Sequence, residues 1–133
     1  MFTIMGDYLH QNFGYTLYGK GQNLARKAKE AYDKILKEYD CLVFPTLPYR
    51  APKIPDEKAN MDEYLQAAFG MVGNTSIFDA TGHPVLQIPV GKSEGLPIGM
   101  SLVGRHFDEA KLYRIARAWE KEVDWKKVNN WEL

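Results

Sequence analysis

The chain has 133 residues, of which 45% are hydrophobic, and its 17 Lys and Arg side chains balance its 17 Asp and Glu side chains. A chain of this size and composition can form the core of one domain, so general disorder is not expected. The zero formal net charge, without a basic stripe, argues against a nucleic-acid partner.

The location of the protein is indicated by three features of the sequence. No apolar stretch approaches the roughly 20 residues of a membrane-spanning helix, so no membrane association is expected. The first ten residues lack the basic start and apolar core of a signal peptide. The single cysteine, Cys41, cannot form an internal disulfide, which favours a reducing compartment. We therefore expect a cytoplasmic protein.

Residues 8–39 are predicted to be mostly helical, with the stronger signal over residues 22–39. In this second part apolar side chains recur at steps of three and four, which places them on one helix face. The predicted inward face consists of Leu24, Ala28, Ala31, Tyr32, Ile35 and Tyr39. Three glycines, Gly14, Gly19 and Gly21, weaken the helix signal in the first part.

The sequence CLVF at residues 41–44 is apolar throughout and predicts a strand buried on both faces. Within it, Cys41 is interpreted as a small buried hydrophobe. Pro45 ends the strand. Residues 45–55 contain four prolines and predict an extended loop, because proline lacks a backbone donor and disfavours helix in the residue before it.

A short helix is predicted at about residues 61–70, where Asn60 and Glu63 have the spacing of a capping box. Its expected inward face consists of Tyr64, Leu65, Ala68 and Phe69. The sequence TGHP at residues 81–84 then predicts a turn.

Two strands are predicted at residues 85–90 and 98–104, separated by a loop at residues 91–97. Pro89 lies inside the first of these strands, which indicates a sheet edge or a bulge there. The order helix, strand, helix, strand, strand, helix predicts an α/β fold class.

The last helix is predicted at about residues 109–123. Asp108 is its expected N-cap, and Phe107 and Leu112 have the spacing of a hydrophobic staple. One apolar stripe is expected to face the core, namely Leu112, Ile115, Ala116, Trp119 and Val123. Residues 124–133 carry two tryptophans, which either dock on the body or leave a loose tail.

Few strands are predicted for so many apolar helix faces. This imbalance indicates that part of the sheet is missing. The chain, residues 1–133, is therefore expected to form a single partial domain that is incomplete on its own.

The sequence carries no metal-binding or cofactor-binding pattern. His10, His83 and His106 are far apart and show neither HxxxH nor CxxC spacing, so no metal site is predicted. Neither a GxGxxG nor a Walker pattern is present, so no cofactor is expected.

No serine or cysteine has the context of an activated nucleophile. Ser76, Ser93 and Ser101 lack a GxSxG motif. His83 allows two interpretations, because Asp79 lies four residues before it. Either Asp79 orients His83 as a base, or Asp79 caps a turn and His83 fills the space before the next proline. The residues alone favour the second.

Three stretches together resemble the C-terminal half of amidase-signature enzymes, in the branch of bacterial aliphatic and aromatic amidases of nitrile degradation. They are NTSIFDATGHPVLQIPVG at residues 74–91, GLPIGMSLVGRHFDEA at residues 95–110 and YDCLVFPTLPYRAPKIP at residues 39–55. The resemblance covers residues 8–122 and implies the C-terminal part of an α/β/α sandwich with a mixed sheet. Gln87 departs mildly from the pattern, because the family more often has a small residue there.

The resemblance implies hydrolysis of carboxylic amides to acid and ammonia. In the family a serine attacks the carbonyl, a second serine relays the proton and a lysine is the base, all in the N-terminal half. No Gly-Gly-Ser-Ser stretch occurs in this chain, so none of these roles is assigned to a residue here.

By position in the family, this chain would contribute one wall of the acyl pocket, formed by Thr46, Met71, Val72, Asn74 and Thr75. Met71 and Val72 are equally well interpreted as plain core residues. Gly82, His83 and Pro84 are assigned to a structural turn that leads into the strand at residues 85–90.

The implied substrate is a small neutral amide. The competing branch is the related protein that transfers ammonia to glutamyl-tRNA, whose pattern has an acid shortly before the Gly-x-Pro turn. The matching position lies near Val72 and is apolar.

Two explanations of the short chain are open. It is either a truncated or misassigned product of an amidase, which is favoured, or a non-catalytic binding and assembly module. Either way, the expected partner is the N-terminal half of an amidase domain or a second copy of the chain.

Overall fold

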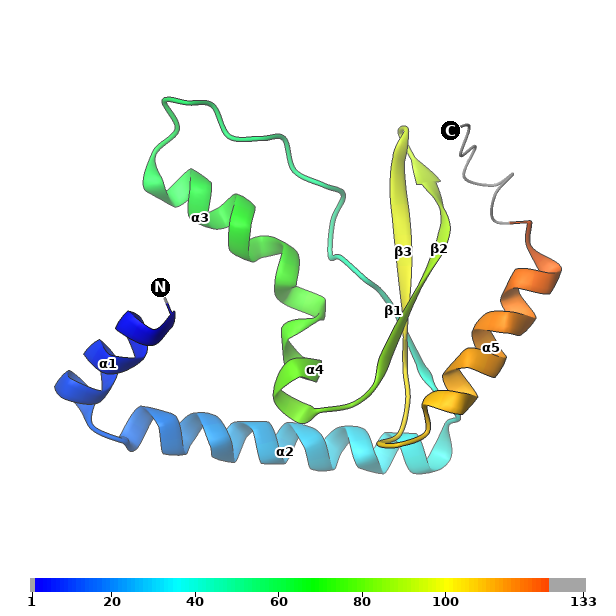
Figure 1. Ribbon diagram of the computed structural model, residues 1–133, viewed down its shortest axis with the longest axis horizontal. Helices are drawn as coiled ribbons and strands as arrows, with labels where there is room; N and C mark the ends of the chain where they lie inside the picture. The colour runs from blue at the N-terminus through cyan, green and yellow to red at the C-terminus, as the bar shows by residue number, and fades with distance from the viewer. Residues whose placement is uncertain (1, 125–133) are drawn as a thin grey trace.

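The computed structural model describes residues 2–124, and side chains from residue 4 onward. The predicted tail, residues 124–133, lies outside the described residues apart from Asp124. The elements in chain order are α1 (Phe2–Phe13), α2 (Thr16–Glu38), β1 (Leu42–Pro45), α3 (Met61–Phe69), η1 (Gly70–Asn74), α4 (Ser76–Thr81), β2 (Val85–Ser93), β3 (Leu96–Val103) and α5 (Glu109–Glu122). Helix α2 runs along one side of the molecule, and the α3–α4 arm and the strands rise from it (Figure 1).

The three strands form one antiparallel sheet in the order β1-β3-β2. The predicted α/β fragment is therefore confirmed, with β3 in the middle. Pro89 is on an outer strand, and the register of β2 shifts between Pro89 and Gly91, as the proline indicated.

The predicted loop at residues 91–97 is wrong. Strands β2 and β3 continue to a tight turn at Glu94 and Gly95, whose φ angles are 50° and 79°. Two consecutive positive φ angles give a hairpin turn whose twist matches that of the strands, so pairing extends through Lys92 and Pro97.

The core lies between this hairpin and α5. It is formed by Ile88, Leu102, Leu112 and Ala116, and the predicted stripe of α5 is confirmed. The predicted cap and staple are wrong. The side chain of Asp108 makes no capping hydrogen bond and instead contacts Lys111. Phe107 is 95% exposed, because its positive φ of 62° belongs to a tight turn that carries the side chain away from the helix.

The long helix expected at residues 8–39 is two helices, divided at Gly14, whose φ is 60°. The face of α2 that is covered is also rotated from the predicted one. Leu36 is buried, whereas Leu24 is 67% exposed and Ile35 and Tyr39 are exposed. Leu36 packs inward because α2 meets the rest of the chain mainly through α4 and the turn after β3.

Helix α3 begins with the predicted capping box. The Asn60 side chain accepts from the Glu63 backbone N–H, and the Glu63 carboxylate accepts from the Asn60 N–H. The predicted inward face is wrong for this chain, because no residue of α3 is buried. Tyr64, Leu65 and Phe69 are exposed, since no other described element covers them.

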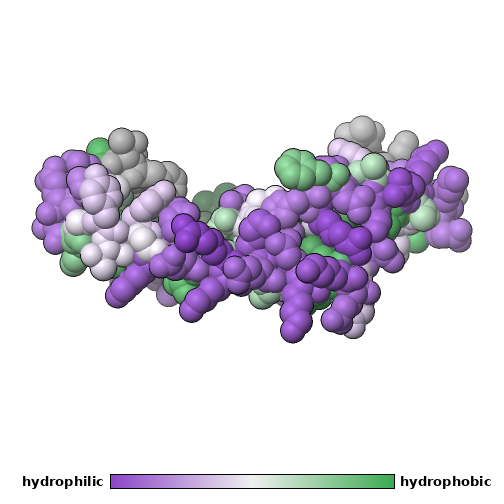
Figure 2. All heavy atoms as spheres, turned by 90° about the horizontal axis from the view of Figure 1, so that it is seen from below, coloured by the Kyte–Doolittle hydropathy of each residue, from purple (hydrophilic) through white to green (hydrophobic). Residues whose placement is uncertain are grey.

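Strand β1 forms where expected, but it is not buried on both faces. Val43 is 55% exposed, because β1 is an outer strand and only one of its faces is covered. The surface seen from below is mostly polar with apolar patches between (Figure 2). None of the described helices is long and apolar enough to cross a membrane.

Candidate functional site

The end of β1 and the middle of β3 bring hydroxyl groups together on one face of the sheet. Thr46 Oγ1 and Ser101 Oγ are 2.9 Å apart and share a hydrogen bond, and Ser101 is buried. The Thr46 backbone N–H donates to the Gly99 carbonyl, which holds the loop against β3. The two hydroxyls thus form a polar patch on this face of the sheet.

A hollow of about 350 Å³ opens beside this patch. Its walls are formed by Thr46, Thr75, Phe78, Asp79, His83, Val85, Gln87 and Ser101. Two of the five predicted pocket residues, Thr46 and Thr75, therefore lie on one hollow. They come from the end of β1 and from the start of α4, which are far apart in sequence.

The other three predicted wall residues lie on η1. The Asn74 side chain donates to the Pro45 carbonyl at 2.8 Å and so ties this segment to the end of β1. Met71 is half-buried and Val72 is exposed. Asn74, Met71 and Val72 are not among the residues that line the hollow.

A larger hollow of about 980 Å³ lies between residues 46–51 and the β2–β3 hairpin. Arg50 forms an ion pair with Glu94 of the hairpin turn and bridges the two sides. Gln87 lines both hollows. A Cβ on Gly99 would meet the Gln87 amide at 2.6 Å, so this glycine gives Gln87 its space. The sequence marked Gln87 only as a departure from the family pattern.

The predicted turn at Gly82, His83 and Pro84 follows α4. Gly82 has a φ of 74° and its N–H donates to the Phe78 carbonyl at 2.7 Å, which ends the helix. The Pro84 carbonyl accepts from the Gly104 N–H at 3.0 Å, which ties the start of β2 to the end of β3.

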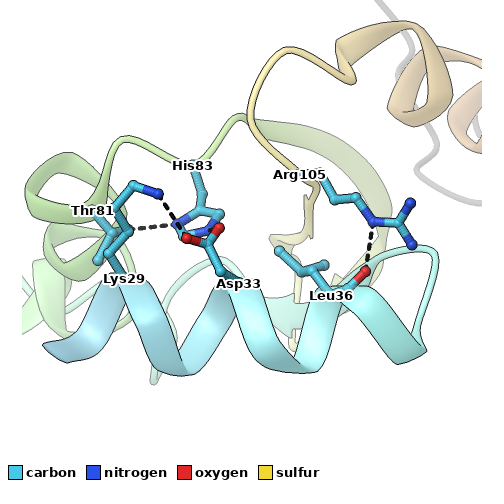
Figure 3. A network of polar contacts seen from close by, with 6 residues as sticks. All are labelled: Lys29, Asp33, Leu36, Thr81, His83 and Arg105. Atoms are coloured by element: carbon cyan, nitrogen blue, oxygen red, sulfur yellow. Dashed lines mark hydrogen bonds and ion pairs between the residues drawn. The ribbon is translucent and has the colours of Figure 1, made fainter. Parts of the chain in front are cut away.

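His83 is buried and makes two polar contacts (Figure 3). Its Nδ1 lies 2.9 Å from Thr81 Oγ1, and its Nε2 lies 3.3 Å from Asp33 Oδ1. Lys29 donates to the other Asp33 oxygen at 2.7 Å. The carboxylate beside His83 is thus Asp33 of α2 and not Asp79, a pairing that no sequence spacing indicates.

The charges around His83 shift several pKa values. Burial, and then the neighbouring His106, lower the pKa of His83, while Asp33 opposes this shift. The hydrogen bond from Lys29 lowers the pKa of Asp33. Cys41 was predicted to be buried within the strand, but it lies just before β1 and is half-buried, packed against the core cluster. Burial raises the pKa of its thiol.

The chain matches the Amidase family over residues 1–113. It is 43% identical over 119 residues to a Rhodococcus erythropolis protein described as uncharacterized in the nthA 5′ region, covering 90% of this chain and 60% of that one. It is 42% identical over 119 residues to the enantioselective amidase of Rhodococcus rhodochrous, covering 89% of this chain and 23% of the amidase.

Among solved structures, the A component of the glutamyl-tRNA(Gln) amidotransferase of Thermotoga maritima superposes with a TM-score of 0.67 at 31% identity. That match covers 90% of this chain and 25% of the amidotransferase protein. These matches show that the chain belongs to the amidase family, as the motifs indicated. The chain spans between about a quarter and 60% of the length of these relatives.

Proposed function

We propose that this chain is the C-terminal segment of an enzyme that hydrolyses carboxylic amides to acid and ammonia. It supplies part of the sheet and one wall of the acyl pocket. The nucleophilic serine, the relaying serine and the basic lysine belong to the N-terminal part of the same amidase domain. The family match supports the proposed reaction. The chain covers only 23% of the enantioselective amidase, which supports the proposal that the catalytic residues lie in another part of the domain.

The observation that carries this proposal is the smaller hollow, which is open and lined by hydroxyl groups, together with the exposed apolar surfaces of α3 and β1. The hydroxyls of Thr46, Thr75 and Ser101 lie on or beside the smaller hollow, and no lysine among the described residues lines it. Ser101 bonds to a threonine, which cannot act as a base at neutral pH. The apolar side chains of α3 and of the outer face of β1 are exposed. Such surfaces need a partner, and the N-terminal part of an amidase domain fits them.

A small neutral amide is the proposed substrate. Identity to the enantioselective amidase is 42%, against 33% to the amidotransferase protein of Thermotoga maritima. In the amidotransferase pattern an acidic residue that binds the glutamine substrate would fall near Val72. In this chain Val72 is apolar and exposed. The reaction needs water and no cofactor. The single cysteine, which is free, fits a cytoplasmic enzyme.

Ammonia release tests the proposal. The chain is assayed with benzamide, propionamide and glutamine, alone and after co-expression with an N-terminal segment of the enantioselective amidase that ends where the similarity begins. We expect no hydrolysis by the chain alone, and hydrolysis of the neutral amides by the combination.

Serine variants provide the control. Ser76→Ala and Ser101→Ala should leave the combined enzyme active, because neither hydroxyl is the proposed nucleophile. Ammonia release by the chain alone that either variant abolishes would contradict the proposal. Preferential hydrolysis of glutamine would contradict the proposed substrate.

A further inference from the structure

Three ionisable side chains from distant parts of the sequence meet beside the turn before β2. Asp33 comes from α2, His83 from the turn after α4, and His106 from the loop after β3. One ligand atom from each lies within 4.8 Å of the other two. The His83 and His106 rings are 4.3 Å apart between centroids. One member of the cluster, His83, also lines the smaller hollow beside the hydroxyl patch around Thr46, whereas Asp33 and His106 do not.

Each member of the cluster offers one ligand atom, and two of these atoms, His83 Nε2 and Asp33 Oδ1, already contact each other. Thr81 Oγ1 accepts from His83 Nδ1–H in one tautomer, which leaves the His83 Nε2 lone pair facing Asp33 Oδ1. Lys29 donates to Asp33 Oδ2, so Oδ1 faces His83 Nε2 alone among the described contacts of this carboxylate (Figure 3). The third side chain, His106, has a buried Nε2 without a hydrogen-bond partner among the described residues. A buried polar atom without a partner is costly, which points to a missing ligand.

We propose that Asp33, His83 and His106 bind a divalent transition-metal ion of the zinc class. Two imidazoles and one carboxylate are ligands that zinc prefers, and a water molecule would complete a tetrahedron. Bonds of about 2.0–2.1 Å place the ligand atoms of such a site roughly 3.4 Å apart. His83 Nε2 and Asp33 Oδ1 already have this spacing, at 3.3 Å.

The surroundings fit this assignment. Thr81 orients the His83 ring as an outer hydrogen-bond partner of a metal-bound histidine does. Burial favours the neutral form of His83, which is the form that binds metal. The Lys29 ammonium lies nearby and weakens cation binding, so we expect micromolar affinity, weaker than at a four-cysteine zinc site. The ion would fasten α2 to the start of β2 and the end of β3.

Zinc titration of the chelator-treated chain tests the site. Isothermal titration calorimetry should give one zinc ion per chain, and zinc should raise the melting temperature, because an ion that binds only the folded state stabilises it. His106→Ala and Asp33→Asn should each weaken binding by more than about 100-fold, beyond the 10–100-fold typical of losing an outer partner. Thr81→Val should fall within that smaller range.

His10→Ala is the matched control, because His10 is an exposed histidine of α1. It should bind zinc as the unchanged chain does. Cobalt(II) gives a second measurement that needs no variant, because a four-coordinate site produces strong visible absorption bands. Absence of saturable zinc binding, equal loss in His10→Ala, or only the weak spectrum of hydrated cobalt(II) would overturn the proposal.

Discussion

The hairpin with α5 and the α1–α3 side of the molecule differ in how their apolar residues are used. Between the hairpin and α5, Leu102 and Leu112 are buried together in one cluster. On the other side, the side chains of residues 4–13 and all of α3 are exposed or only partly covered. Both regions are regular and amphipathic, yet among the described residues only the hairpin with α5 has its apolar face covered.

This difference shows that a helix can form from local signals even where its apolar face is not packed. Helix α3 forms from its own signals, since Asn60 and Glu63 close a capping box at its start. Helix α5 lacks a side-chain cap and instead packs Leu112 against Gly104, where a Cβ would meet the leucine at 3.0 Å. Caps can set where a helix begins, but burial supplies most of its stability.

The largest expected effect is a core truncation. Leu102→Ala should destabilise the chain by about 2–5 kcal/mol, because it removes a fully buried side chain and leaves a cavity. Leu24→Ala, the same change at an exposed position, should change stability by less than about 0.5 kcal/mol. Urea unfolding measures both. Equal losses of stability at the two positions would contradict the distinction between the packed hairpin region and the exposed helix surface.

The next effect is a pH dependence in the covered region. The folded-state pKa of His83 is lowered, mainly by burial, so the unfolded chain binds more protons as the pH falls below about 6.5. Stability due to neutral His83 is thus fully present above this pH and is lost as the pH falls through the folded pKa. Melting temperatures between pH 8 and pH 5 should fall on acidification. His83→Gln should flatten the dependence of the melting temperature on pH, whereas the control His10→Ala should leave it unchanged. If His83→Gln also leaves it unchanged, another titrating group is responsible.

A smaller and local effect is expected in α3. Asn60→Ala should weaken this helix by about 1 kcal/mol, because it removes the side-chain acceptor of the capping box. The core is untouched, so hydrogen exchange should become faster in residues 61–69 alone. Asn60→Ser, which keeps an acceptor at the cap, should exchange nearly as the original does. Faster exchange in β3 of Asn60→Ala would show that the two regions are coupled.

The smallest expected effect is at the ion pair between Arg50 and Glu94. Both side chains are substantially exposed, so Arg50→Ala should cost between about 0 and 1 kcal/mol, and less at high salt. Lys53→Ala, a charge removed from the same loop, serves as the control. A loss well above this range, unchanged by salt, would mean that the loop is part of the covered region.

Local signals in the sequence predicted much of the fold. The capping box at Asn60, the stripe of α5 and the irregularity at Pro89 each follow from a few neighbouring residues. The inward faces of α2 and α3 could not be predicted, because their apolar residues exceed what this chain can cover. The turn at Glu94 was missed because a non-glycine residue takes a positive φ there.

The candidate sites were predictable to different extents. Thr46 and Thr75 were predicted as pocket-wall residues from the family resemblance, and both line the smaller hollow. The cluster of Asp33, His83 and His106 had no sequence signal, since its members are 50 and 23 residues apart and only the fold joins them. Long-range contacts of this kind depend on how α2 packs against the residues just before β2 and just after β3.

Size-exclusion chromatography with light scattering tests the central claim most directly, namely that this chain is one part of a larger amidase domain. The account predicts that the 15.2 kDa chain alone self-associates through its exposed apolar surfaces. Mixed with an N-terminal amidase segment, it should instead elute as a complex of one copy of each. A compact monomer that does not bind the N-terminal segment would contradict the account and favour an independent binding module.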